Sequence, residues 1–433
     1  MSKYKFSIVE KTLNEMFSPE WLRQTAKETK MIKRERKVDA VVMFWVMVLS
    51  FGVRLQRTLA SLKREYEKED KTHLSDGSWY ERFTPEFVLF LKTCVLHGIE
   101  MMSKQSNRKL NDKLKKFNDV FIVDSTIVRL HKSLAKIWPA ARTRTVAAGV
   151  KVGMLISAVS DGPKRVVIRG ERTNELKTLR IGHWIKNCVL LIDLGFYKHQ
   201  VFTRIKEYGG HFVSRVKGNA DPYIVAVHQT YRGNSIDVVG KYLSEILPRL
   251  KRSVLDVEVE VSFRRRGYKG KHRGDTERFR LVAVYNEEDR KYHTYLTTIP
   301  LDVLSAEDVA LLYGLRWDVE LIFKELKSKY ALDVVDTTNP QIVEAFIWTA
   351  ILTLLVSRRI YALVRENNPG KRLVRYTQLR WSTIFTENAS DQLTTILEYC
   401  GITRTFETVM NVYDSHALDP HVNRYRFRDD WRS

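Results

Sequence analysis

Two short, wholly apolar runs, each ended by an aspartate, constrain the fold more than any other feature of the sequence. Residues 120–123 read Val-Phe-Ile-Val before Asp124, and residues 189–192 read Val-Leu-Leu-Ile before Asp193. A strand that is apolar on both faces is usually buried on both faces, which is typical of a sheet that lies between helices. We therefore predict an α/β core in which both aspartates follow buried strands.

The chain before this core reads as helical and basic. Residues 1–118 combine apolar segments such as Ala40–Val53 with basic linkers such as Lys27–Lys37. We expect an all-helical first domain that binds nucleic acid through this linker and the cations beyond it, Arg54, Arg57, Lys63 and Arg64. The alternative is that these charges only keep the protein soluble.

The chain after the two apolar runs changes character twice. Alternating runs such as Leu255–Phe263 and Tyr292–Thr298 predict an antiparallel β-rich insertion over residues 218–300. A capping sequence at Ser305 then opens a helix to about Lys329, and a second helix covers about residues 341–364. The predicted domains are residues 1–118, a core of 119–217 and 301–366, the insertion, and a helical region of 367–433.

Charge and cysteine content limit the classes of partner. The chain holds 73 Lys and Arg against 51 Asp and Glu, a formal charge of +22, which favours a polyanionic partner. Cys94, Cys188 and Cys400 lie far apart, so they indicate neither a disulfide framework nor a zinc site, and a reducing cytoplasm fits best. The runs Ala40–Val53 and Ala345–Val356 are shorter than the ~20 residues of a membrane span, and no export signal is evident. We expect no membrane association.

One face of the helix near residue 320 gathers polar side chains. At about 100° per residue, a single narrow stripe holds Tyr313, Arg316, Glu320, Lys324 and Lys327, while apolar residues cover the other side. Glu320 is therefore a carboxylate among cations. The alternative is a solvated helix face with ion pairs such as Glu320 to Lys324.

Three carboxylates, Asp124, Asp193 and Glu320, are thus candidates for one site. The two aspartates follow strands, where α/β sheets place their sites, although each could instead be a helix cap or a turn former. Converging carboxylates need cations between them, and oxygen ligands without Cys or His select Mg²⁺ or Mn²⁺. Two such ions about 3.5 to 4 Å apart support in-line displacement at phosphorus. A basic protein with this site suggests phosphodiester chemistry.

The spacing Y-(2)-R-(3)-E-(6)-K on the helix resembles the signature of the insertion-sequence-four family of DDE transposases. It is formed by Tyr313, Arg316, Glu320 and Lys327. Further matches, in the order of the family, are FIVDST around Asp124, LIDLGFY around Asp193, and HFVSRVKGNA with Arg215 and Lys217. The resemblance covers about residues 120–364.

This resemblance implies a ribonuclease H-like core that a β-rich insertion interrupts before the last acid. It implies that Asp124, Asp193 and Glu320 are catalytic and hold two Mg²⁺ ions, for which Mn²⁺ can substitute. Phosphates at the cleaved DNA end would be bound by Tyr313, Arg316 and Lys327. Further candidate DNA contacts are Lys324 on the same stripe, Arg215 and Lys217, and the cations Arg264, Arg265 and Arg266 between two predicted strands, for which the alternative is a solvated loop.

The reaction implied is cut-and-paste transposition. Hydrolysis at the element's end frees a 3′ hydroxyl, which attacks the opposite strand to form a hairpin; the hairpin is reopened and the end joins target DNA. Family members flip a base against an aromatic residue of the insertion. The family's tryptophan just ahead of Leu296 is absent here, so the stacking candidates are Tyr292, His293 and Tyr295, with ordinary strand packing as the alternative.

The partners implied are double-stranded DNA at terminal inverted repeats, target DNA and a second copy of the chain in a synaptic complex. The dimer interface is expected in the helices after Pro369, and the protein is expected in the cytoplasm of a prokaryotic cell, acting on nucleoid DNA. Two other functions remain open. One is a structure-selective nuclease on the same core, and the other is a transposase-derived DNA-binding protein without catalysis.

Overall fold

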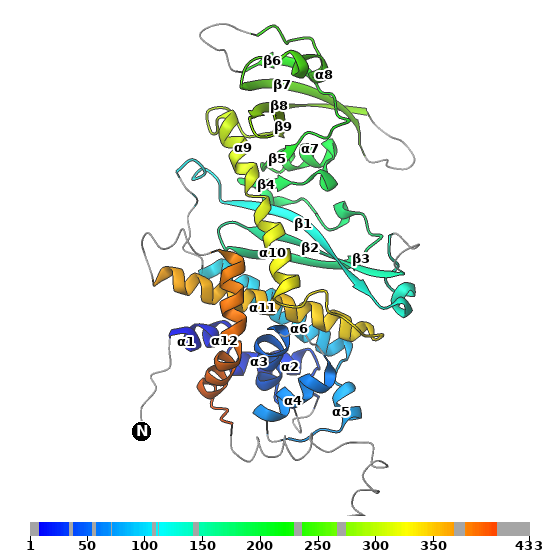
Figure 1. Ribbon diagram of the computed structural model, residues 1–433, viewed down its shortest axis with the longest axis vertical. Coiled ribbons are helices and arrows are strands. Elements are labelled where there is room, and N and C mark those ends of the chain that lie inside the picture. The colour runs from blue at the N-terminus through cyan, green and yellow to red at the C-terminus, as the bar shows by residue number, and fades with distance from the viewer. Residues whose placement is uncertain are drawn as a thin grey trace, which may run out of the picture. The chain divides into compact units, whose positions relative to one another are not determined.

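The computed structural model describes ten parts of the chain (Figure 1). These are residues 8–33, 38–53, 58–70, 72–105, 110, 112–141, 147–228, 236–265, 274–367 and 377–404. The chain forms two compact units, one made of Met1–Met101 with Lys324–Ser433 and the other of Met102–Phe323. The two sequence boundaries between them fall within helix α6 (Pro85–Gln105) and within helix α10 (Trp317–Ser328).

A single nine-stranded mixed sheet forms the second unit, in the order β3-β2-β1-β4-β5-β9-β8-β7-β6. Its strands are β1 (Asp119–Leu130), β2 (Ala148–Ser157), β3 (Gly162–Gly170), β4 (Cys188–Ile192), β5 (His211–Arg215), β6 (Tyr223–Val227), β7 (Val254–Arg264), β8 (Gly274–Asn286) and β9 (Lys291–Thr297). The strands β1, β4 and β5 run parallel to one another, and every other pairing is antiparallel. The predicted α/β class is confirmed.

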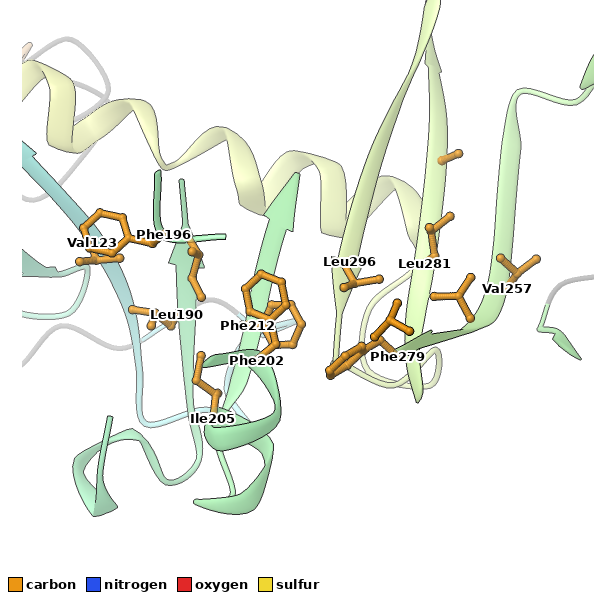
Figure 2. Close-up of a cluster of buried hydrophobic side chains, with 14 of the residues drawn as sticks. Val123, Leu190, Phe196, Phe202, Ile205, Phe212, Val257, Phe279, Leu281 and Leu296 are labelled. Atoms are coloured by element: carbon orange, nitrogen blue, oxygen red, sulfur yellow. The ribbon is translucent and has the colours of Figure 1, made fainter. Parts of the chain in front are cut away.

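The β-rich segment continues the same sheet. Strand β9 pairs with β5, with Ser214 opposite Leu296, and β8, β7 and β6 follow outward from β9. One hydrophobic cluster spans this junction, and Figure 2 shows Leu190 and Phe212 on one side of it and Leu281 and Leu296 on the other. The β-rich strands are therefore built onto the core and share its packing.

Two helices cover opposite faces of this part of the sheet. Helix α7 (His199–Glu207) lies on the face of the cluster in Figure 2, where Phe202 stacks on Phe212 at 4.2 Å between ring centroids. Neighbouring strand residues point to opposite faces, so Tyr295, next to Leu296, faces the other side, where its ring packs against Tyr313 of α9 (Ala306–Gly314). The expected burial on both faces is thus found here.

Two predicted helices differ from the structure. The helix expected from Ser305 to about Lys329 begins as predicted, with the Ser305 hydroxyl capping the Asp308 amide, but it breaks into α9 and α10 after Gly314. Glycine is among the poorest helix formers. At the break the backbone forms hydrogen bonds between residues three apart, as in a 3-10 turn, such as that from the Arg316 N–H to the Tyr313 carbonyl. The sequence pattern also predicts one helix over residues 175–186, but these residues form two short 3-10 helices, η3 (Glu175–Lys177) and η4 (His183–Ile185), with an extended Gly182 immediately before the second.

Among its described residues, the other unit has helices as its regular elements and no strand. Its helices are α1 (Ile8–Met16), α2 (Pro19–Glu28), α3 (Ala40–Leu49), α4 (Leu59–Glu69), α5 (Asp76–Tyr80), α6 (Pro85–Gln105), α11 (Pro340–Glu366) and α12 (Gln378–Tyr399), with the 3-10 helix η1 (Phe51–Val53) after α3. Helix α3 is wholly buried. Gly52 of η1 meets α11 so closely that a Cβ on it would lie 2.0 Å from the Thr353 hydroxyl, which requires glycine there.

Helix α11 is long and apolar enough to cross a membrane by length and composition. In the structure, however, 83% of its most apolar stretch is buried inside the protein, as in the core helix of a soluble protein. Its Arg358 is buried and pairs with buried Glu325, which also accepts a hydrogen bond of 2.8 Å from the Tyr330 hydroxyl. This ion pair ties α11 to the end of α10.

We predict that Glu325→Ala lowers the free energy of unfolding by about 3–5 kcal/mol, because it leaves the buried Arg358 guanidinium without its counter-ion. The measurement is chemical denaturation monitored by circular dichroism. Exposed Glu387 of α12 is the matched control, and Glu387→Ala should change the free energy by no more than about 0.5 kcal/mol. Equal effects of the two substitutions would contradict the assignment.

Candidate active site

The two aspartates are placed by adjacent parallel strands. The pairing of β1 with β4 ends at Val123 opposite Ile192, and the next residue on each strand is Asp124 or Asp193. Strand β1 continues to Leu130 with β2 as its partner, whereas the chain turns away after β4. Both carboxylates therefore lie beyond the carboxyl end of β4, where α/β sheets place their sites.

Asp124 is partly buried on the sheet face opposite the cluster of Figure 2. Its Oδ1 accepts a hydrogen bond of 2.7 Å from the Ser125 amide. Burial raises the pKa of Asp124 from 3.8 to about 6; the negative charges of Asp193 and Glu320 act in the same direction, whereas the Ser125 amide and Arg316 oppose it. Asp124 thus lies in the electrostatic field of the other two acids.

Asp193 has a local structural role as well. Its side chain caps the 3-10 helix η5 (Leu194–Phe196) by accepting from the Gly195 amide at 3.5 Å. Asp193 therefore does cap a turn, as the alternative interpretation predicts, and this role uses only one of its two carboxylate oxygens. The other oxygen, Oδ1, faces the Nε of Arg316 at 3.8 Å.

Glu320 reaches the same place from α10. Its Oε1 lies 2.8 Å from NH1 of Arg316, one helical turn earlier. Arg316 therefore contacts both Asp193 and Glu320, and its charge also lowers the pKa of Asp124. Three acids from β1, the end of β4 and α10 gather around one guanidinium.

The donor chemistry of this cluster fits a hard divalent cation. Its carboxylate oxygens are the ligands that Mg²⁺ and Mn²⁺ prefer, and their mutual repulsion contributes to the raised pKa of Asp124. In the described parts of the chain, no three His, Cys, Asp or Glu side chains lie close enough together to hold one ion as they stand. The positive charge among the acids belongs to Arg316.

The other signature residues lie in different surroundings. Tyr313 is buried, and its hydroxyl points at the Ile192 carbonyl at 3.5 Å, immediately before Asp193. Burial raises the pKa of Tyr313 to about 12, so the phenol stays protonated. Lys324 is exposed and Lys327 partly exposed on the later turns of α10, in the part of the helix that belongs to the helical unit.

The three rings proposed for base stacking all have partners in the protein. The Tyr292 hydroxyl donates to the Leu250 and Arg252 carbonyls, and His293 pairs with Asp289 at 2.8 Å. Tyr295 is 5% exposed and packs on Tyr313. These contacts are those expected of strand packing.

The predicted basic contacts differ in availability. Arg215 ends β5 and is partly exposed, Lys217 follows it exposed, and Arg264 is exposed at the end of β7. Arg265 is exposed but forms ion pairs with Asp275 and with Glu207. Arg266, Arg54 and Arg57 lie outside the described residues, as do residues 34–37 of the basic linker. Lys63 is buried and pairs with Asp76 at 2.8 Å.

A fourth carboxylate beside the cluster was not predicted. Glu175 of η3 lies against Gly195, in the turn after Asp193, and its Oε1 is 3.4 Å from the Ser125 hydroxyl. Buried Lys151 of β2 lies 3.5 Å from the same oxygen. The sequence around Glu175 carries no signal for this, because its neighbours are far away along the chain and only the fold brings them together.

Comparisons with known proteins cover the region that holds this cluster. Residues 115–356, which include all three acids, match the protein family described as Transposase DDE domain. The chain is 24% identical over 386 residues to the transposase for insertion sequence element IS231F of Bacillus thuringiensis subsp. israelensis, covering 79% of this chain and 78% of that protein. It is 22% identical over 387 residues to the transposase for insertion sequence element IS1151 of Clostridium perfringens, covering 82% and 81%.

We predict that Asp124→Asn raises the melting temperature of the metal-free protein at pH 8 by a few degrees. The raised pKa means that the folded protein binds a proton at Asp124 more tightly than the unfolded chain does. Ionisation of Asp124 therefore lowers the free energy of unfolding as the pH rises from about 4 through about 6. The uncharged amide of Asn does not ionise, so the variant does not lose this stability.

The measurement is calorimetry in a chelating buffer at pH 5 and pH 8. The gain should be smaller at pH 5 than at pH 8, and Glu288→Gln, at an exposed acid of the same unit, should show no such difference. A gain independent of pH would mean that the charge of Asp124 is not the cause.

Proposed function

Because this chain belongs to the family of transposases with a DDE domain, we propose that it moves an insertion sequence by cut-and-paste transposition. The observation that carries the proposal is the gathering of Asp124, Asp193 and Glu320 around Arg316. These acids come from three separate elements, and the family match spans all three. The +22 formal charge suits a DNA substrate.

The core of this transposase is ribonuclease H-like. The order β3-β2-β1-β4-β5, with β1, β4 and β5 parallel, supports this assignment. Strands β6 to β9 form the insertion before the last acid, over residues 218–300, and the core comprises residues 119–217 and 301–366. On the strength of the family resemblance, residues 1–118 bind DNA and residues 367–433 form the dimer interface.

The three acids would hold two Mg²⁺ ions, which Mn²⁺ could replace. Such ions would supply activation of the attacking oxygen and stabilisation of the leaving oxygen of an in-line displacement. The chain supplies the oxygen ligands and fixes their positions. Tyr313 supports the strand end that carries Asp193, through its hydroxyl and the Ile192 carbonyl. Asp193 is also held by its own cap on η5.

DNA phosphates at the element's end are bound by Arg316 and Lys327, with Lys324, Arg215 and Lys217 as further contacts. Arginine suits this role because its planar fork can donate two hydrogen bonds to one phosphate. Arg215 faces the same region, since its charge acts on Tyr313. Because Tyr313 is buried, we infer that its main role is to support the turn that carries Asp193 and that direct contact with a phosphate is secondary.

The reaction begins with water attacking the phosphorus at the element's end, which breaks the bond to the 3′ oxygen and frees a 3′ hydroxyl. That hydroxyl attacks a phosphodiester of the opposite strand and displaces the 3′ hydroxyl of the flanking DNA, which leaves a hairpin on the element's end. A second water opens the hairpin, and the freed 3′ hydroxyl attacks a target phosphodiester and displaces a 3′ hydroxyl of the target strand. The hairpin step rests on the family resemblance. Of the three candidate rings, Tyr295 would have to leave a buried position to stack on a flipped base.

The partners are terminal inverted repeats, target DNA and a second copy of the chain that holds the other end. The site of action is the nucleoid, in the cytoplasm of a prokaryotic cell. The test is to incubate the purified protein with Mg²⁺, a linear DNA carrying the inverted repeats that bracket the gene, and a supercoiled target. Joined products support transposition. Cleavage alone indicates a nuclease, and a mobility shift alone indicates a DNA-binding protein.

We predict that Glu320→Gln retains end binding and lowers cleavage and joining at least about a hundredfold, because an amide is a poor ligand for a hard cation. Denaturing gels measure cleavage, and mobility shifts measure binding. Exposed Glu307 of α9 provides the control, and Glu307→Gln should leave both unchanged. Cleavage that survives Glu320→Gln would remove Glu320 from the metal site.

We also predict that Arg264→Ala weakens DNA binding at all sequences and flattens its salt dependence, because it removes a phosphate contact. Arg265→Ala is the matched comparison, since Arg265 is already paired with Asp275 and Glu207 and should contribute less. Binding measured between about 50 and 200 mM salt tests this. A larger effect at Arg265 would reverse the assignment.

A further inference from the structure

The acid cluster already contains a cation that belongs to the chain. Arg316 lies 2.8 Å from Glu320 and 3.8 Å from Asp193, and its side chain is only 12% exposed. Its guanidinium also lies 5.3 Å from the ring centre of Trp317 and 5.9 Å from that of Tyr313. Two ion pairs and two rings therefore hold Arg316 among the acids.

This arrangement and a bound metal ion exclude each other. The Glu320 oxygen that contacts Arg316 is one that an ion would need, and like charges in one small cluster repel. In the described residues no three ligating side chains lie close enough together to hold one ion. Metal binding requires Arg316 to move out of the cluster.

The present position of Arg316 also leaves part of it unsatisfied. Its Nε is buried and lacks a hydrogen-bond acceptor in the structure. A buried donor without an acceptor is costly, and a phosphate oxygen would satisfy it together with NH2 in the two-pronged contact that arginine favours. A DNA phosphate is therefore a better partner for Arg316 than the acids are.

We propose that Arg316 is an internal counter-ion that keeps divalent metal out of the acid cluster until a DNA-end phosphate draws it away. Metal binding is then coupled to DNA binding at this residue. The coupling is reciprocal, so the DNA end tightens metal binding by the same factor as metal tightens end binding. The inference rests on the proposed function for the identity of the metal ligands and of the phosphate.

The experiment measures Mn²⁺ binding to the full chain by electron paramagnetic resonance of the free ion. The probe DNA is a duplex that ends at the cleaved inverted repeat, so that no cleavage is needed. We expect the duplex to tighten Mn²⁺ binding of the unaltered protein at least about tenfold. Arg316→Gln should bind Mn²⁺ about tenfold more tightly than the unaltered protein without DNA, and the duplex should then add little.

Arg204→Gln, at an exposed cation of α7, is the control for a general change in charge and should leave Mn²⁺ binding unchanged. Arg316→Met keeps an apolar stem against Trp317 and replaces the glutamine variant if that variant does not fold. Mn²⁺ binding that is equal or weaker in the Arg316 variants would overturn the proposal.

A second substitution separates this failure from failure of the proposed function. Glu320→Gln is added to Arg316→Gln, and Mn²⁺ binding is measured again. If Glu320→Gln weakens Mn²⁺ binding but Arg316→Gln does not change it, the counter-ion role of Arg316 is refuted and the metal site is not. If Glu320→Gln leaves Mn²⁺ binding unchanged, the metal site is refuted, and with it the proposed function.

Discussion

Repulsion among three carboxylates is the constraint on which the rest of the structure depends. Two of them are fixed by the parallel pairing of β1 with β4, which ends at the rung before Asp124 and Asp193. The third arrives on α10, and Arg316 offsets part of the repulsion. Burial is the main cause of the raised pKa of Asp124, and the charges of Asp193 and Glu320 raise it further while that of Arg316 lowers it. Additional positive charge near the three carboxylates would therefore stabilise their ionised forms.

The two strand-end aspartates could be predicted from the sequence because both signals are local. Four consecutive apolar residues specify a strand buried on both faces, and the first polar residue afterwards marks where the strand leaves the core. The Ser305 cap was predictable for the same reason, because it needs only the Ser305 hydroxyl and the backbone amide three residues later. The helical periodicity around Glu320 also placed Arg316 beside it, which the ion pair of 2.8 Å bears out.

What escaped prediction depends on contacts between distant segments. Because the helix breaks after Gly314, Tyr313 and Glu320 lie on different helices, and the Tyr313 hydroxyl points at the Ile192 carbonyl. Glu175 meets Ser125 and Lys151 only because η3 lies beside the turn after β4. Arg265 looked like a free cation in a basic run, but its partners come from α7 and β8. No periodicity or motif within one segment carries such information.

The pairing of β5 with β9 has an evolutionary consequence. A segment joined to the rest of a fold only by two loops can be lost or exchanged as a unit, whereas the β-rich residues 218–300 contribute the strand that covers the edge of β5. Its removal would expose unpaired backbone and open the hydrophobic cluster that both halves share. Lineages carrying this architecture are thus expected to retain β8 and β9 together with the buried positions of β7, such as Val257, so that sequence drift would be largest at the outer edge strand β6.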